Sequence, residues 1–551
     1  MRTLRQPVPH TPDEGEKNKE ENMKKLVSIL LAAVMIIGLA ACGNQPKEST
    51  PAATIPDQTQ GTVAPVDNTK KYKESVTIAY WFDLDTADPY GSTTAAQQFY
   101  TNFTFDNVVF NDPDTGELVP QLAESWKDVN GDGLVWEFIL RKNVKFHNGN
   151  VLKAEDVKFT WEYTASGAGN VVKSNANSSY VDSIEVVDDN TVRFKLKTAM
   201  FDWPSYMETK IYNKAAFDKL PAEEAAVIGT GPYYYDKSKH TSGVQFTAER
   251  FDDYWAGIEE YPTKSIIFKV LLDEDSRVAA VQAGSVDFIF NVNAASYNTL
   301  SSDKNLQMFT RKGANSYYMG FNHRKEAMKN PDVRKALAMG INRTDIKDIS
   351  FNNGIGGVEN FNFCVPSGAG YSADAKAPDY NVEEAKKLLA AAGYTDLKLV
   401  LGHTATTKAI AEVVQDCLGD IGVTVELRQV DASNWTAFKK ADEYDLFTDY
   451  AAYQGALLYN FHRFFDPAGS ANMFGYDNEE YVKLENEVLT AGSYEKMVAK
   501  FADLQKFVAE NLPLVPLAVG NQIAAGKLDV EGVTLAPGTN YMNFSHIRIA
   551  E

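Results

Sequence analysis

Histidine, cysteine and serine most often carry metal or nucleophilic chemistry, and in this chain they are scattered. No two of the seven histidines stand at His-x-x-x-His spacing, and Cys364 and Cys417 form no Cys-x-x-Cys pair. Dedicated zinc sites use such clustered ligands. The Gly-x-Ser-x-Gly element of many serine nucleophiles is also absent. The sequence therefore predicts no catalytic residues, no metal site, no cofactor and no enzyme.

Amide side chains that follow an expected strand are better placed to contact a small ligand. Residues 266–272 alternate as a strand, residues 275–284 form a helix closed by a glycine, and residues 286–291 form the next strand. This β-α-β order indicates an α/β lobe. Ligands in such sheets lie beyond the carboxyl ends of strands, so we expect Asn291 and Asn293 to be polar ligand contacts.

Length and charge limit the possible architectures and partners. A chain of 551 residues is too long for one core, and two or three lobes are expected. The formal net charge of −20 argues against nucleic acid as a partner, because phosphate binding needs a basic surface. Cys364 and Cys417 could form a disulfide in an exported protein or remain two separate buried thiols.

The N-terminal part has the pattern of an export signal. Two lysines follow Met23, and residues 26–40 are apolar but fewer than the roughly 20 residues of a spanning helix. The segment ends in Leu-Ala-Ala-Cys, which resembles a bacterial lipobox and makes Cys42 the expected lipidation site; a signal peptide with a chance cysteine is the alternative.

Residues 1–22 do not fit a signal peptide, so Met23 is the expected start. Residues 43–71 have hardly a large apolar side chain and are expected to form a flexible tether.

The stretch from residue 118 to 163 contains four short sequence motifs in a fixed order. They are Leu-Ala-Glu-Ser-Trp at 122–126, Leu-Arg-Lys at 140–142, Val-Lys-Phe-His at 144–147 and Ala-Glu-Asp-Val at 154–157. This order resembles the extracellular solute-binding proteins of peptide/nickel ABC importers, the oligopeptide- or dipeptide-binding family (family 5). Later blocks continue the likeness, among them Gly-Thr-Gly-Pro-Tyr at 229–233 and Val-Arg-Lys-Ala-Leu at 333–337.

The resemblance implies a two-lobed α/β fold of the periplasmic-binding-protein type, enlarged by an extra subdomain and hinged on two or three crossing strands. The expected order along the chain is an upstream extension with lipoprotein signal at 1–41, tether at 42–72, lobe I at 73–106, extra subdomain at 107–228, lobe I again at 229–311, lobe II at 312–515 and a return to lobe I at 516–551.

The resemblance also implies ligand contacts. The family's first strand ends at the cleft, which makes Tyr80 and Trp81 candidate wall residues, with plain core packing as the alternative. The strand that crosses between the lobes adds Tyr317 and Asn322 as candidates.

The likeness is weakest after residue 445. Peptide-binding members carry a Trp and then an Asp that pairs with the α-ammonium group of the peptide, and neither stands at the expected position here. Asp449, which is out of register, or Asp466, through a shifted loop, could supply the carboxylate. Three further side chains would suit a neutral ligand such as an oligosaccharide: Tyr450, Tyr453 and Gln454.

The resemblance therefore predicts a monomeric, lipid-anchored protein on the extracytoplasmic face of the cell membrane. It would capture a peptide and deliver it to ABC permease subunits that are driven by separate ATPases. An oligosaccharide or a nickel chelate as ligand, or a sensor or adhesion role for the same fold, are the alternatives.

Overall fold

The computed structural model describes residues 65–91, 95–112, 117–167, 180–366, 368–431, 434–452, 456–536 and 543–551. All of them belong to one unit, Ala53–Glu551. The predicted signal segment, Cys42 and most of the predicted tether lie outside the described residues, as do Tyr453 and Gln454.

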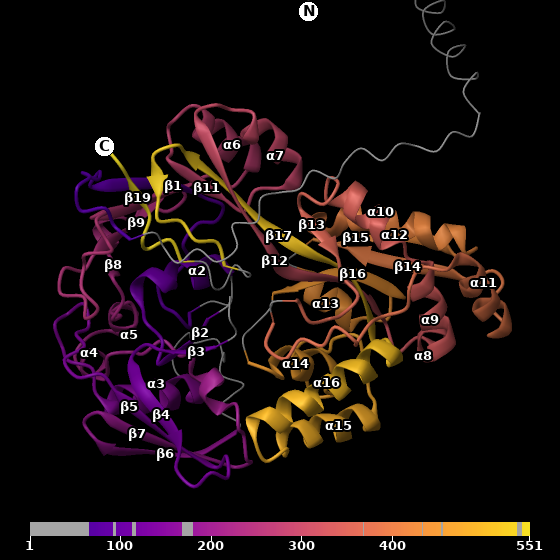
Figure 1. The fold of residues 1–551 in the computed structure, drawn as a ribbon, viewed down its shortest axis with the longest axis horizontal. Helices are drawn as coiled ribbons and strands as arrows, with labels where there is room; N and C mark the ends of the chain where they lie inside the picture. Colours follow the sequence, from indigo (N-terminus) through magenta and orange to yellow (C-terminus); the bar gives the residue numbers. More distant parts are fainter. Residues whose placement is uncertain are drawn as a thin grey trace, which may run out of the picture. The chain divides into compact units, whose positions relative to one another are not determined.

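One large mixed sheet organises the fold (Figure 1), and two long antiparallel strands, β12 and β17, run through its middle. On one side of this pair, β1 pairs in parallel with β10 and β11; on the other, β14 pairs in parallel with β15 and β16. In sheet order, with β13 (Gly357–Glu359) pairing with β17 off the path, the strands are β15 (Thr424–Gln429), β14 (Lys398–His403), β16 (Leu446–Ala452), β12 (Leu306–Phe321), β17 (Leu514–Lys527), β11 (Phe288–Phe290), β1 (Ser75–Tyr80), β10 (Ser265–Val270), β9 (Gln245–Arg250) and β8 (Tyr233–Tyr235).

A smaller antiparallel sheet holds the stretch that carries the sequence signature. Its strand order is β4 (Ala123–Asp128), β5 (Val135–Leu140), β7 (Thr191–Leu196) and β6 (Val181–Asp188). Gly131 and Gly133 both adopt positive φ in the turn between β4 and β5, as the Asn-Gly-Asp-Gly sequence predicts. Short pairs complete the strands: β2 (Val109–Asn111) with β3 (Leu118–Pro120), and β18 (Val530–Glu531) with β19 (Arg548–Ile549).

Helices pack against both sheets. In the first half of the chain they are α2 (Ala95–Thr104), α3 (Ala154–Ser166), the 3₁₀ turn η2 (Trp203–Met207), α4 (Lys214–Phe217), α5 (Ala222–Ala225), η3 (Lys237–Lys239), α6 (Glu274–Gln282) and α7 (Ala294–Ser301). In the second half they are α8 (Glu326–Lys329), α9 (Pro331–Gly340), α10 (Arg343–Asp345), η4 (Ile346–Ser350), α11 (Val382–Ala391), η5 (Ala405–Thr407), α12 (Lys408–Asp420), α13 (Trp435–Lys440), α14 (Tyr459–Phe465), α15 (Glu479–Leu489) and α16 (Tyr494–Asn511).

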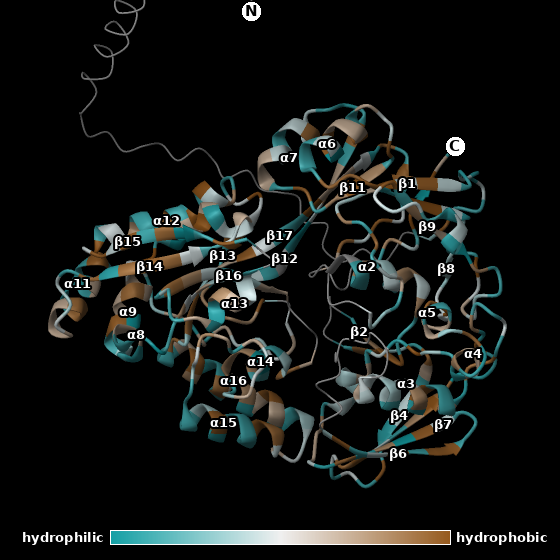
Figure 2. Cartoon of the chain, turned by 180° about the vertical axis from the view of Figure 1, so that it is seen from behind, coloured by the Kyte–Doolittle hydropathy of each residue, from teal (hydrophilic) through white to brown (hydrophobic). Residues whose placement is uncertain are grey.

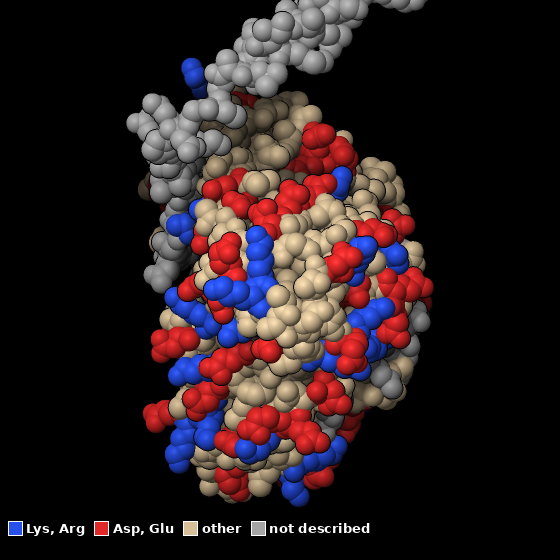
Figure 3. Space-filling model, turned by 90° about the vertical axis from the view of Figure 1, so that its right-hand side faces the viewer, with Lys and Arg blue, Asp and Glu red and all other residues tan. Residues whose placement is uncertain are grey.

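Apolar side chains concentrate on the strands between these helices, as the colouring of β14 and β16 shows (Figure 2). The predicted β-α-β order appears as β10, α6 and β11, and Gly284 adopts the left-handed conformation after α6. Lys and Arg lie among Asp and Glu on the face drawn in Figure 3, so the net negative charge is not a single acidic patch there. In the described part of the chain, no helix is long and apolar enough to span a membrane.

The alternative left open for the cysteines is resolved by the structure. Cys364 and Cys417 are both buried and both free. Cys364 packs in the cluster around β16 and α16, whereas Cys417 lies on α12 in the cluster around β14. They are two separate thiols.

Candidate ligand-binding site

The strand pair β12 and β17 has an irregularity where the two parts of the large sheet meet. Residues 306–311 of β12 pair in register with residues 527–522 of β17, and residues 315–320 pair with residues 520–514. Between Arg311 and Asn315 the register shifts, and Gly313 adopts a φ of +84°. Such a bulge interrupts the ladder and bends the strand, so the two parts of the sheet are joined at a point suited to a hinge.

Three polar groups at this crossing are buried without a hydrogen-bond partner. They are the Oδ1 atoms of Asn315 and Asn521 and the Oγ atom of Ser316. The amide nitrogen of Asn521 is already used, because it donates to the carbonyls of Gly354 at 3.2 Å and Ile355 at 3.1 Å. A buried polar atom left without a partner costs about 1–3 kcal/mol. A ligand donor that reached these oxygens would therefore remove such a cost.

Ser316 also lines a small cavity between β12, β16 and α14. Its volume of about 10 Å³ is room for about one water molecule. The side chain of Asn460, on α14, lies at the same cavity with its Oδ1 atom buried and unpartnered. The rest of the lining is apolar or weakly polar: Phe363, Cys364, Val365, Ala451, Ala456, Leu457 and Phe461.

Of the residues predicted from the sequence, the structure brings Tyr317 and Tyr450 together. They are directly opposite each other on β12 and β16, with ring centroids 5.5 Å apart. Tyr450 is 43% exposed, and the ring of Phe351 covers Tyr317 at 5.2 Å. Ser316 points to the other face of the sheet, because neighbouring residues of a strand alternate. The aromatic pair and the small cavity are thus on opposite faces.

Asp449 does not offer a free carboxylate for an α-ammonium group. One oxygen accepts a charge-assisted hydrogen bond from Lys439 Nζ at 2.7 Å and another from Trp435 Nε1 at 2.9 Å. The other oxygen accepts the backbone N–H of Tyr450 at 3.0 Å. The predicted pairing of Asp449 with a ligand conflicts with this arrangement, because the charge is already neutralised inside the second part of the sheet.

Asn322 has a structural place rather than a cleft position. Its side chain is fully buried and donates to the carbonyl of Tyr444 at 2.9 Å, so it fixes the loop before β16. Tyr80 is also fully buried, with four phenylalanine and tryptophan rings within 5.7 Å of its own. Plain core packing, the alternative left open for Tyr80, describes it, whereas its neighbour Trp81 is only partly buried.

Asn291 and Asn293 follow β11 as predicted, and both are exposed. Asn291 adopts a φ of +56°, a conformation that asparagine accepts more readily than most residues. The side-chain and backbone N–H groups of Asn293 both donate to the carboxylate of Glu274 on α6. Contact of Asn291 and Asn293 with a ligand stays a prediction.

A larger polar cavity of about 350 Å³ lies between the end of α2 and the segment at 208–210. Lys210 donates to Asn102 Oδ1 at 2.9 Å, and burial lowers the pKa of its ammonium group to about 8. Burial raises the pKa of Asp106 to about 6, although Trp255 and Tyr254 both donate to its carboxylate. The lining comes from segments as distant in sequence as Gln98 and His546, which is why no local motif indicates it.

Comparison with known proteins identifies the family. The model of the bacterial extracellular solute-binding proteins, family 5 (middle part), matches residues 117–473. The chain belongs to this family. The resemblance seen in the sequence is confirmed, and the family supplies the substrate-binding, non-enzymatic component of transporters.

Individual relatives agree with this assignment. Heme-binding protein A of Haemophilus influenzae is 27% identical over 460 residues, which cover 76% of this chain and 82% of that protein. The oligopeptide-binding protein AppA of Bacillus subtilis is 28% identical over 471 residues, or 77% and 82% of the two chains. The solved structure of AppA from Bacillus subtilis in complex with a nonapeptide has a TM-score of 0.73 at 23% identity, covering 88% of this chain and all of that one. The predicted two-lobed α/β fold is confirmed.

Sequence reasoning missed Ser316, Asn460 and Asn521. Single serines and asparagines carry no motif, and their interest arises only from burial without partners. The one available signal was position: Ser316 directly precedes Tyr317 in the strand that the sequence indicates as a crossing between lobes.

Proposed function

We propose that this chain captures peptides outside the membrane and delivers them to the permease of an ABC importer that is driven by separate ATPases. Family membership supports the solute-binding role, and the relative named for oligopeptides supports peptide as the ligand class. The observation that carries the proposal is the crossing of β12 and β17, where a bulge adjoins three buried, unpartnered oxygens.

These oxygens suit a ligand that presents hydrogen-bond donors, although by strand alternation Asn315 is on the face of Tyr317 and Ser316 is on the opposite face. A peptide backbone offers an N–H group at every residue except proline, and main-chain hydrogen bonds give affinity without dependence on sequence. Asn315 Oδ1 and Asn521 Oδ1 are acceptors, and Ser316 Oγ can accept or donate. Binding would also require the two parts of the sheet to open and close, for which the bulge at Gly313 provides the bend.

The test is thermal denaturation of the purified chain with three separate sets of compounds: short peptides, oligosaccharides and nickel chelates. A ligand present at 100 times its Kd adds about 2.7 kcal/mol to the free energy of unfolding, which raises the Tm measurably. A shift with peptides alone supports the proposal. A shift with oligosaccharides or nickel chelates alone would instead identify one of the alternatives, and no shift with any set would contradict the proposal. A ligand-binding sensor or adhesion role would show a shift without uptake of the ligand by cells.

A pair of variants locates the site. Ser316→Ala removes an unpartnered hydroxyl at the crossing, and Thr247→Val removes an unpartnered hydroxyl in the core at β9. Neither change should lower the Tm of the ligand-free chain, because neither hydroxyl has a partner to lose. We expect Ser316→Ala alone to reduce the ligand-induced shift. Equal shifts in both variants would place the ligand elsewhere, with the polar cavity at Lys210 as the next site to test.

We further propose that the chain is a lipoprotein held to the extracytoplasmic face of the membrane through Cys42. The Leu-Ala-Ala-Cys sequence after an apolar segment supports this. In a bacterial expression host, wild type is expected in the membrane fraction and Cys42→Ser in the soluble exported fraction. Recovery of both in the soluble fraction would contradict the lipid anchor without affecting the solute-binding proposal.

A further inference from the structure

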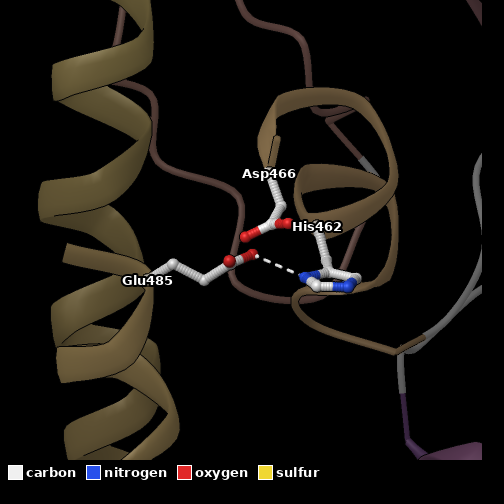
Figure 4. Close-up of side chains that lie close together, drawn as sticks. All are labelled: His462, Asp466 and Glu485. Carbon is white, nitrogen blue, oxygen red and sulfur yellow. Dashed lines mark hydrogen bonds and ion pairs between the residues drawn. The ribbon is translucent and has the colours of Figure 1, made fainter. Parts of the chain in front are cut away.

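Helices α14 and α15 bring a histidine and two carboxylates together (Figure 4). His462 lies on α14, Asp466 directly follows this helix, and Glu485 points toward them from α15. One nitrogen or oxygen atom from each of the three lies within 4.8 Å of the other two. His462 Nδ1 and Glu485 Oε1 are 3.3 Å apart. Asp466 stands four positions after His462, a spacing that places both side chains on one side of the helix end.

The negative charge of this cluster exceeds its positive charge. Among the ion pairs of the described residues, neither Asp466 nor Glu485 has a Lys or Arg partner, and His462 is the one basic group. Glu485 is only 3% exposed, and burial together with the charge of Asp466 raises the pKa of its carboxyl group. Two carboxylates therefore share one imidazole, and of the three side chains only that of Glu485 is buried.

A further acid, Asp202, adds to this excess. Asp202, at the start of η2, is 3% exposed, and neither of its carboxylate oxygens has a hydrogen-bond partner. Burial raises the pKa of the nearby Tyr180 phenol to about 12, and the charges of three carboxylates contribute further. Those three are Glu485, Asp466 and Asp202. The ring of Tyr180 packs edge-on against His462, with ring centroids 6.5 Å apart. Asp202, whose charge acts on Tyr180, is therefore close to the His462 cluster.

We propose that His462, Asp466 and Glu485 bind a divalent transition cation. Ligand atoms on a tetrahedral zinc ion are about 3.4 Å apart, because each lies about 2.0–2.2 Å from the metal. The His462–Glu485 distance already meets this spacing, and the Asp466 carboxylate, which lies within 4.8 Å of both ligand atoms, would have to move closer to complete it. One imidazole and two carboxylates favour zinc, nickel or cobalt over calcium or magnesium, which take oxygen ligands.

The surroundings hold the ligands in orientation. The hydroxyl of Tyr481 donates to Glu485 Oε1 at 3.1 Å, and the backbone N–H of Ala468 donates to Asp466 Oδ1 at 2.8 Å. Hydrogen bonds of this kind orient the side chains that bind a metal directly, and they raise its affinity. Three protein ligands leave a fourth position open. The prediction from the sequence that the chain has no metal site rested on the lack of paired histidines, and a His-x-x-x-Asp pair completed by a distant glutamate escapes that criterion.

The experiment uses the purified, tag-free chain after treatment with EDTA. Zinc, nickel, cobalt and, for comparison, magnesium are titrated separately by calorimetry, and cobalt binding is also followed by its visible absorption. We expect one zinc ion per chain, bound at least about tenfold more tightly than magnesium, and a cobalt spectrum of low coordination number. Absence of saturable zinc, nickel and cobalt binding would overturn the proposal.

Variants separate this site from adventitious binding. His462→Gln and Asp466→Asn should each weaken zinc binding by about tenfold or more, since each removes a direct ligand. The matched control is His240→Gln, which alters another histidine near a carboxylate, His240 Nε2 being 3.9 Å from Asp83. Zinc affinity should not change in this control. Wild-type zinc affinity in both site variants would overturn the proposal, and a cooperative unfolding transition in EDTA shows that the variants still fold. The result does not depend on which solute the protein carries.

Discussion

Asp449 and Asp466 are close in sequence, but the fold neutralises their charges to different extents. Asp449 meets the ammonium group of Lys439 and the indole N–H of Trp435, and both ionic side chains are mostly buried at 13% and 15% exposure. Asp466 shares a single imidazole with a second, more deeply buried carboxylate. Asp449 therefore belongs to a structural ion pair whose charges are neutralised. The cluster of Asp466, Glu485 and His462 has excess negative charge, which a bound cation would stabilise.

The largest expected effect on stability comes from breaking the ion pair of Lys439 and Asp449. Lys439→Met keeps the apolar stem of the lysine but leaves Asp449 without a cation, and the loss of one partner of a mostly buried pair is expected to lower the free energy of unfolding by about 2–3 kcal/mol. Urea denaturation of wild type and variant measures this difference.

The double variant Lys439→Met/Asp449→Asn is the control for that prediction. An amide at position 449 is uncharged and keeps an oxygen for the Trp435 N–H group, so the double variant should recover part of the lost stability. If the double variant is no more stable than Lys439→Met, the cost comes from lost lysine packing and the ion pair contributes little.

The pH dependence of the second cluster is a smaller effect of known sign. The hydrogen bond to Glu485 raises the pKa of His462 above its usual value of 6.5. A raised histidine pKa contributes stability that is fully present below pH 6.5 and is lost as pH rises through the value in the folded chain. Glu485, whose pKa is also raised, changes stability in the same direction. The groups that face His462 are Glu485, Asp466 and the ring of Tyr180.

In EDTA, the contribution of His462 to the free energy of unfolding should therefore fall as pH rises above about 6.5, whereas His147, His323 and His546, whose pKa values are lowered by burial, contribute in the opposite direction. The His462 contribution stays below about 1 kcal/mol because its side chain is 40% exposed and solvent screens the pair. Urea denaturation between pH 6 and pH 8.5 should show stability falling more, or rising less, with increasing pH in wild type than in His462→Gln. An equal slope in both would assign the pH dependence to other groups, of which Asp202, with its pKa raised to about 7 by burial, is the first.

The sequence predicts the fold far better than it predicts the site. The fold follows from local patterns that the structure repeats, such as the turn at residues 130–133 and the helix closed by Gly284. The site depends on which groups a side chain meets. Asn322 and Asp449 were reasonable polar candidates, yet they are used up by the Tyr444 carbonyl and by Lys439. Lys439 stands only ten residues from Asp449, but a spacing between a helix and a strand does not reveal a contact.

The smallest expected effect comes from Asp466→Asn, and its sign is opposite to that expected for Asp449→Asn. Asp466→Asn removes one of the two negative charges beside His462, so in EDTA at pH 8 it should raise the free energy of unfolding by a few tenths of a kcal/mol, as is typical of like-charge pairs near a surface. It should also lower the pKa of His462, because the charge of Asp466 contributes to its elevation. NMR titration of the His462 ring and urea denaturation measure the two effects. The parallel change Asp449→Asn leaves Lys439 buried without its carboxylate and should lower stability. If both asparagine variants are destabilised alike, Asp466 is as fully compensated as Asp449, and the electrostatic reason for a cation at His462, Asp466 and Glu485 is lost.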